Sequence, residues 1–325
     1  MSILRPSRRD ILKLTAAAPA FALTTPVMAN TAAPHAGQNT GFFRFSMGAA
    51  QLTVISDGYF TTSTAGMGVN ADEADVLTFL ENHFQDTTQR YAHTNHIVIE
   101  LGAAKVLVDV GSGSRFQPTV GRMLDNLDAA GIDADSITHV ALTHAHPDHV
   151  WGIRDDFDEA LFPDAQYLIG TVEHQWWTKD NRVNEVPEAM QQMVLGAVNS
   201  LAAVSNTLAL VENNHEVAPG IRMIDTPGHT PGHMSLMVES EGQSLLIIGD
   251  AITHPYVSFQ HPEWYGENDM DGDLTVKTRQ RLLDMSATDR MTVLGYHFPF
   301  PGVGYVKPQG DAYQFIPALW QWDAD

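Results

Sequence analysis

The sequence contains 325 residues, no cysteine and a formal net charge of −21 at pH 7. The first 29 residues carry four cationic side chains and one acidic side chain, so the remainder is near −24 and is a poor partner for nucleic acid or an anionic membrane surface. Without cysteine the chain has no disulfides, and any metal site must use His, Asp or Glu side chains.

Residues 1–29 show the features of an export signal in the expected order. Arg8 and Arg9 precede an apolar run that ends in Val27-Met28-Ala29, a small-residue site of the kind that signal peptidase cleaves. The apolar run is shorter than the roughly 20 residues of a membrane span. The segment resembles a twin-arginine signal, which implies a periplasmic or secreted protein, and an ordinary amphipathic helix is the alternative.

The chain after the signal is expected to form one domain. Residues 30–40 are small and polar, which predicts a flexible leader. Residues 41–325 contain no repeat, no Pro/Gly/Ser linker and no second apolar span, so we expect no membrane insertion of the mature chain.

Strands and helices are expected to alternate in blocks along the chain. Residues 51–60, 96–101 and 105–110 predict strands, and the spacing from Val120 to Leu127 predicts a helix that ends near Gly131. A strand at 137–142 and a helical region at 171–201 follow. Further strands are predicted at 221–226, 233–240, 243–250 and 291–297. The order predicts a mixed α/β sandwich.

The segment LTHAHPDHVWG, residues 142–152, places three histidines and one aspartate within six positions. Alternate residues of an extended segment point the same way, so His144 and His146 can reach one ion. The turn after Pro147 re-aims Asp148 and His149 towards a neighbouring ion. Imidazole nitrogens and carboxylate oxygens are ligands of zinc and similar ions. Histidines without a metal are the alternative, which the cost of burying unpaired polar groups disfavours.

Three further candidate ligands lie at or after predicted strands. His229 belongs to TPGHTPGH, Asp250 ends the strand at 243–250, and His297 ends the strand at 291–297. An aspartate whose two oxygens bind different ions would hold them about 3.5–4 Å apart, as in two-metal hydrolytic sites.

These motifs resemble the metallo-β-lactamase superfamily, and within it the methyl parathion hydrolase-like and quorum-quenching lactonase-like branch. RFSMGAAQLTVISDGYF, TPGHTPGHMSLMVES and FPFPGVGYV extend the similarity over nearly all of residues 41–325. The resemblance implies a four-layer αββα sandwich, two divalent ions, most commonly zinc, and a homodimer. It implies that His144, His146 and His229 bind one ion, that Asp148, His149 and His297 bind the other, and that Asp250 bridges them. His233 and Asp109 are then expected to support ligands without binding a metal; a structural role for His233 and a turn-capping role for Asp109 stay open.

The expected chemistry is metal-assisted hydrolysis of an ester or a lactone, with Asp148 and Asp250 as catalytic ligands. A hydroxide held between two cations would attack the substrate. Asp148 can relay a proton to the leaving group, although ligation alone is the simpler interpretation. Organophosphate triesters are a possible secondary substrate class, a zinc β-lactamase activity is the alternative, and a non-catalytic metal-binding module is less favoured.

An aromatic-lined pocket for a small-molecule substrate is also expected. Trp176 or Trp177 is the favoured lining residue. The other aromatic candidates near the expected mouth are Trp151, Phe259, Trp264 and Tyr265. His254 is a further candidate to face the pocket. Related acyl homoserine lactonases typically place a tyrosine three residues after the bridging aspartate, where this chain has Thr253.

Overall fold

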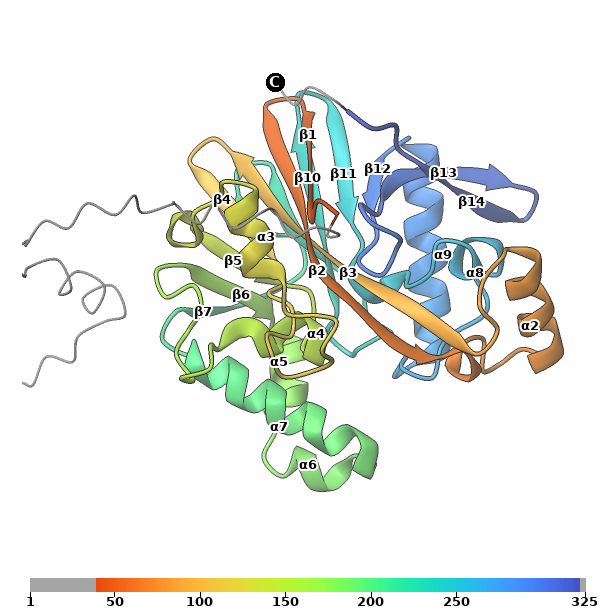
Figure 1. The fold of residues 1–325 in the computed structure, drawn as a ribbon, viewed down its shortest axis with the longest axis horizontal. Coiled ribbons are helices and arrows are strands. Elements are labelled where there is room, and N and C mark those ends of the chain that lie inside the picture. Colours follow the sequence, from red (N-terminus) through yellow and green to blue (C-terminus); the bar gives the residue numbers. More distant parts are fainter. Residues whose placement is uncertain (1–38, 322–325) are drawn as a thin grey trace, which may run out of the picture. The chain divides into compact units, whose positions relative to one another are not determined.

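Two seven-stranded sheets carry the candidate ligands in the computed structural model, which describes residues 39–321 (Figure 1). The predicted signal, residues 1–29, lies outside the described residues, as do all but the last two positions of the predicted leader. Within residues 39–321, no helix combines the length and the apolar character that crossing a membrane requires.

The first sheet follows the order of the chain from β1 to β7. Its strands are β1 (Phe42–Met47), β2 (Ala50–Ser63), β3 (Gln89–Leu101), β4 (Ala104–Val108), β5 (His139–Leu142), β6 (Gln166–Gly170) and β7 (Leu208–Val211). Strands β1 to β4 pair antiparallel, whereas β4 to β7 pair parallel. The carboxyl ends of β4, β5 and β6 therefore meet at one edge, which is where open α/β sheets place their sites.

The second sheet runs in the order β14-β13-β12-β11-β10-β9-β8. Its strands are β8 (His215–Ala218), β9 (Ile221–Asp225), β10 (Met234–Ser240), β11 (Gln243–Ile247), β12 (Thr292–Leu294), β13 (Val303–Gln309) and β14 (Ala312–Pro317). Strand β10 is antiparallel to β9 and to β11, and β11 is parallel to β12. The carboxyl ends of β9, β11 and β12 therefore also share one edge.

The helices cover the outer faces of the two sheets. They are α2 (Glu73–Asn82), α3 (Met123–Ala129), α4 (Pro147–Val150), α5 (Thr171–Trp177), α6 (Arg182–Glu185), α7 (Glu188–Ala203), α8 (Val257–Gln260) and α9 (Gly272–Thr288), with short 3-10 turns at Thr64–Gly66, Ala134–Ser136, Trp151–Ile153 and Gly249–Ala251. The helical region expected at 171–201 is divided because Asn181 adopts a left-handed conformation (φ 62°) and Pro187 precedes α7.

Successive side chains along a strand face opposite sides of its sheet, and this alternation produces the four layers. In β3, Ile97 and Ile99 join a core between the sheets, whereas Val98 packs with residues of α3, α5 and α7. In β11, Leu245 and Ile247 face the first sheet, and Leu246 packs with residues of α9. Figure 1 shows α3, α5 and α7 away from α9, on the other side of the sheets. The expected αββα sandwich is confirmed.

Candidate metal centre

The histidine segment begins where β5 ends at Leu142. Pro147 opens the one-turn helix α4, a position that suits its fixed φ and missing N–H. His146 stands just before this helix in an extended conformation, and Asp148 and His149 lie within it. The change from extended to helical backbone turns Asp148 and His149 away from the direction of His144 and His146. All four side chains are buried.

The TPGHTPGH segment, residues 226–233, forms the loop between β9 and β10. Gly228 has a φ of 135°, and a Cβ there would lie 2.4 Å from the amide nitrogen of Thr275. A Cβ on Gly232 would lie 2.0 Å from the amide nitrogen of Glu173. Both glycines therefore allow close packing against neighbouring backbone, which holds His229 and His233 in the interior.

The candidate ligands meet in two groups that share an edge of the sandwich. His144, His146, His229 and Asp250 form the first group, and Asp148, His149 and His297 form the second. In each group the ligand atoms lie within 4.8 Å of one another. In the first group, His146 Nδ1 lies 3.0 Å from both His144 Nε2 and His229 Nε2. The structure thus brings together all seven residues that the resemblance nominated.

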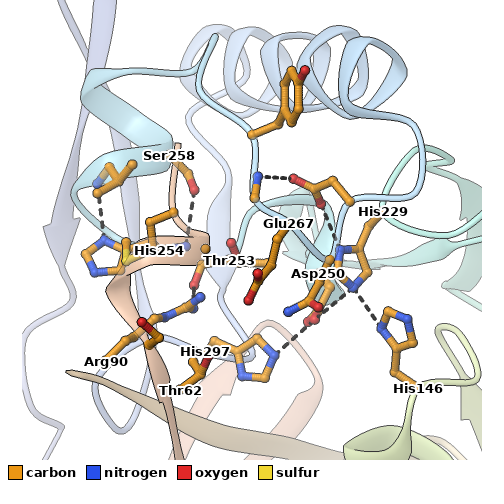
Figure 2. A pocket seen from close by; sticks show the side chains of 18 of the residues that line it. Thr62, Arg90, His146, His229, Asp250, Thr253, His254, Ser258, Glu267 and His297 are labelled. Carbon is orange, nitrogen blue, oxygen red and sulfur yellow. Dashed lines mark hydrogen bonds and ion pairs between the residues drawn. The ribbon is translucent and has the colours of Figure 1, made fainter. Parts of the chain in front are cut away.

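Asp250 contacts members of both groups. Its Oδ2 lies 3.3 Å from His229 Nε2 in the first group and 3.0 Å from His297 Nε2 in the second. Its Oδ1 lies 3.5 Å from His149 Nε2. Figure 2 shows Asp250 between His297 and His229, with His146 beyond His229. This is the position that a carboxylate bridging two ions must occupy.

Several buried atoms of the centre fit a pair of cations. Asp148 Oδ2, His149 Nε2 and Asp250 Oδ1 are buried and find no hydrogen-bond partner among the described residues. Unpaired buried polar atoms are costly, and two cations would satisfy all three at once. The donor set of five imidazoles and two carboxylates suits zinc and other divalent transition metals.

The protonation states of three candidate ligands suit metal binding, which requires unprotonated ligands, whereas nearby carboxylates outweigh the effect of burial and raise the pKa of His149 and of His229. Burial, aided by the charge of His229, lowers the pKa of His146 to about 3. Burial also holds the pKa of His144 well below its usual value. For Asp148, burial acts to raise the pKa, but the charges of His149 and His297 outweigh it and lower the pKa to about 2. His144 and His146 are therefore neutral, and Asp148 is ionised.

Asp109 and His233 hold ligands in place. Asp109 follows β4, and its Oδ2 accepts hydrogen bonds of 2.8 Å from His149 Nδ1 and from Thr143 Oγ1. His233 Nδ1 bonds to Thr226 Oγ1 at 2.8 Å, so its Nε2 accepts the backbone N–H of Asp250 at 2.9 Å. The doubled histidine motif therefore supplies one ligand-group residue, His229, and one residue that positions Asp250.

Asp269 is a supporting residue that the sequence analysis missed. Its Oδ1 lies 2.8 Å from His229 Nδ1, and its Oδ2 accepts the N–H of Gly266 at 2.8 Å and lies 3.6 Å from Arg279 Nη2. Burial acts to raise the pKa of Asp269, but the hydrogen bond and charge of His229, followed by the charge of Arg279, lower it. No spacing rule ties Asp269 to His229, so the contact follows from tertiary structure alone.

Glu173 is a second missed residue, and it joins the two histidine loops. The buried carboxylate accepts hydrogen bonds from the N–H of Ala145, from Trp177 Nε1, from Thr230 Oγ1 and from the N–H of Gly232. Ala145 lies between His144 and His146, and Thr230 and Gly232 lie in the TPGHTPGH loop. Burial raises the pKa of Glu173, although all four hydrogen bonds oppose the rise.

The structure corrects the expectation for Trp176 and Trp177, because neither lines the cavity over the centre. Trp177 is 0 % exposed and packs edge-on against the His146 ring, with its indole N–H bonded to Glu173. Trp176 stacks on the guanidinium of Arg182, 4.3 Å from the ring centroid. Both residues belong to α5, which faces the core of the first sheet rather than the cavity.

The cavity is instead enclosed by segments from both sheets and their loops. Its floor includes His146, Asp148, His229, Asp250 and His297. Its aromatic walls are Phe60, Phe116, Trp264 and Tyr265, of which the last two were among the candidates near the mouth. Polar wall residues include Thr62, Arg90, Thr253, His254 and Ser258 (Figure 2). A small molecule in this cavity therefore meets ligand atoms below and aromatic rings around it.

Known proteins with similar sequences are mostly lactonases. The family described as the metallo-beta-lactamase superfamily matches residues 92–160. An N-acyl homoserine lactonase from Bacillus sp is 21% identical over 176 residues, which covers 54% of this chain and 62% of the relative. One from Bacillus thuringiensis is 27% identical over 134 residues, covering 41% of this chain and 46% of the relative. The chain thus spans about half the length of the curated relatives it matches.

Two solved structures match over most of their length. AidC, a dizinc quorum-quenching lactonase in complex with the product N-hexanoyl-L-homoserine, has a TM-score of 0.82 and 26% identity, covering 86% of this chain and 98% of AidC. The hydrolase AbOPH of the beta lactamase superfamily has a TM-score of 0.81 and 29% identity, covering 87% of this chain and 99% of AbOPH. The chain therefore resembles the metallo-beta-lactamase superfamily over residues 92–160, and over most of its length it resembles a quorum-quenching lactonase and a hydrolase of the beta lactamase superfamily.

Proposed function

We propose that the protein is a two-metal hydrolase that cleaves lactones and carboxylic esters. One observation carries the proposal: the Asp250 carboxylate lies between two ligand groups and, with Asp148 and His149, contributes the buried unpaired atoms that two cations would satisfy. The similarity to a dizinc lactonase supports zinc as the metal and a lactone as the substrate. The homodimer and the export route stay predictions.

The side chains around the candidate metal centre have different roles in such a reaction. Bound metal ions of this kind lower the pKa of a coordinated water to about 7 and polarise the substrate oxygen. Asp109 and Asp269 hold the His149 and His229 rings in fixed orientations. Asp148 lines the cavity and is ionised, so it can accept a proton from the attacking water and then pass that proton to the leaving alkoxide. The aromatic walls limit the access of bulk water to the reacting group.

Aryl phosphotriesters are a second candidate substrate class. The observation in their favour is the group of aromatic rings around the metal ligands, Phe60, Phe116, Trp264 and Tyr265, which suits a flat aryl leaving group. We rank this activity below lactone hydrolysis because most of the relatives described above are lactonases.

The first test is the metal content of the purified protein and of the Asp250→Ala variant. We expect two equivalents of divalent metal in the parent and a sharp loss in the variant, together with the loss of lactone ring opening measured as acid release. Asp164→Ala is the matched control, because Asp164 is an exposed aspartate outside the cavity. One equivalent or none, unchanged by Asp250→Ala, would overturn the ligand assignment.

A substrate panel then separates the alternatives. The metal-loaded protein is assayed on a lactone, an aryl ester, an aryl phosphotriester and the β-lactam nitrocefin. We expect the lactone and the ester to be cleaved most efficiently. Turnover of nitrocefin alone would favour a β-lactamase, and two bound metals with no turnover of any member would favour a non-catalytic module.

A further inference from the structure

Arg90 places a guanidinium in the wall of the cavity. It lies in β3, where it pairs in register with Thr62 of β2. Both residues line the cavity, beyond the part of these strands that pairs with the rest of the sheet. Figure 2 shows the side chain of Arg90 extending towards Thr253 and the metal ligands.

The guanidinium is held in place by a single contact to the backbone. Its Nη2 donates a hydrogen bond to the carbonyl oxygen of Thr253, three residues after the bridging Asp250. A guanidinium carries five N–H donors in a planar fork, so this bond fixes its direction and leaves other donors for a ligand. The contact also ties the guanidinium to the loop that carries Asp250.

The charge of Arg90 has no dedicated partner among residues 39–321, where no carboxylate forms an ion pair with it. Asp148 and Asp250, the cavity carboxylates whose charges act on Arg90, belong to the ligand groups, and Asp269, the third, is bonded to His229. Glu267 also lines the cavity and makes no ion pair with Arg90. The neighbouring His254 is neutral, because burial and then the charge of Arg90 hold its pKa well below its usual value.

We propose that Arg90 is a specificity residue that binds an oxygen acceptor on the acyl part of the substrate, remote from the scissile carbonyl. The acceptor is a carboxylate or an amide carbonyl, which a guanidinium fork binds with directed, charge-assisted hydrogen bonds. This inference rests on the proposed hydrolysis of esters and lactones at the metal ligands. It also accounts for an isolated cation inside a protein with a net charge of −21, which otherwise repels anions.

The kinetic test compares three 4-nitrophenyl esters that differ only at the far end of the acyl chain: a methyl group, a primary amide or a carboxylate. We expect Arg90→Met to raise KM for the amide and carboxylate esters by about tenfold or more, with kcat changed less than about twofold. The methyl ester should change little in either constant. Arg90→Lys keeps the charge without the fork and should fall between the parent and Arg90→Met.

Arg281→Met is the matched control. Arg281 is exposed on α9 and, like Arg90, donates one hydrogen bond to a backbone carbonyl, that of Asp225. It should behave as the parent on all three esters. Metal content must stay at the parent value in Arg90→Met, which separates loss of recognition from displacement of the Asp250 loop. An equal loss of kcat/KM on all three esters would overturn the proposal.

A binding measurement keeps this test separate from the proposed reaction. Calorimetric titration of the metal-loaded protein with butyrate, glutaramate and glutarate offers the same three end groups on ligands that cannot be hydrolysed as esters. We expect tighter binding of glutaramate and glutarate than of butyrate in the parent and no preference in Arg90→Met. Equal binding of all three by the parent would overturn the role of Arg90, whereas a preference without ester turnover would overturn only the proposed hydrolase activity.

Discussion

The two halves of the metal centre are built in different ways. The contiguous half, His144 to His149, comes from one segment after β5 in the first sheet. The dispersed half, His229, Asp250 and His297, comes from loops after β9, β11 and β12 in the second sheet. Short local turns arrange the contiguous half, whereas the dispersed half depends on three strand ends reaching the same edge.

Buried contacts between the halves compensate for this difference. Glu173 bonds to both histidine loops, and Tyr296 of the dispersed side donates a 2.6 Å hydrogen bond to the carbonyl of Asp148. The Tyr296 ring also stacks on His149 with centroids 4.0 Å apart. The comparison teaches that the local motif is a sufficient signal for recognition, but that a working geometry depends on side chains outside the motif.

The largest effect on stability is expected at Glu173, the residue that joins the two halves by hydrogen bonds. Glu173→Ala would leave two buried backbone N–H groups, the Trp177 indole N–H and the Thr230 hydroxyl without their acceptor. We expect the free energy of unfolding to fall by about 3–5 kcal/mol, measured by urea denaturation of the metal-free protein. Metal affinity should fall for both ligand groups together.

Two further variants test whether the loss in Glu173→Ala comes from the hydrogen bonds of its carboxylate. Glu173→Gln keeps the shape but replaces one acceptor oxygen by a donor, so an intermediate loss is expected. Glu188→Ala removes an exposed glutamate from the first turn of α7 and should change stability by less than about 0.5 kcal/mol. A loss in Glu173→Ala no larger than that in Glu188→Ala would show that the two loops are held together by other contacts.

The next largest effect should distinguish the two ligand groups, each of which takes residues from both halves. Asp109→Asn removes the carboxylate that orients His149 in the second ligand group, and Asp269→Asn removes the one that orients His229 in the first. Each change should weaken metal binding about 10- to 100-fold in its own group and much less in the other. Competition with a chromophoric chelator measures the two affinities, with Asp164→Asn as the exposed control.

The opposite result would be equally informative. If Asp109→Asn and Asp269→Asn each weakened both metal affinities equally, the two ligand groups would bind metal as one cooperative unit, and the division into two groups would have no energetic meaning. The bridging position of Asp250 is the structural route by which such coupling would pass.

Much of the fold follows from local patterns in the chain. The four layers depend on alternation in strands such as β3 and β11, which is visible in the sequence. The predicted strands at 243–250 and 291–297 end early in the structure, at Ile247 and Leu294, so that Asp250 lies in the 3-10 turn Gly249–Ala251 and His297 lies in a loop. The extended arms of β2 and β3 that bring Thr62 and Arg90 to the cavity had no such signal, because polar residues in a hairpin resemble ordinary surface strands.

In the candidate site too, some residues have a signal in the sequence and others have none. The candidate ligands were predicted because their order matches a known motif, and the dispersed candidates were predicted from the resemblance alone. The roles of Asp269 and Glu173 could not be predicted, since Asp269 lies 40 positions from His229, and Glu173 lies 28 positions from Ala145 and 57 from Thr230. The two tryptophans were misplaced because aromatic residues suit a pocket wall and a core equally well, and only the packing of α5 decides between these roles.

The smallest predicted effect is a change in KM, and it tests whether Trp264 rather than Trp176 lines the cavity. Trp264→Ala removes a cavity wall and should raise KM for an aryl ester about fivefold, whereas Trp176→Ala, outside the cavity, should change it less than about twofold. For an aliphatic lactone the effect of Trp264→Ala should be smaller, because a ring lost from the wall costs most when the substrate itself is aromatic. If Trp176→Ala raised KM as much as Trp264→Ala, substrate would have to contact α5. The wall of the cavity would then be formed by α5 and not by the loops around Trp264.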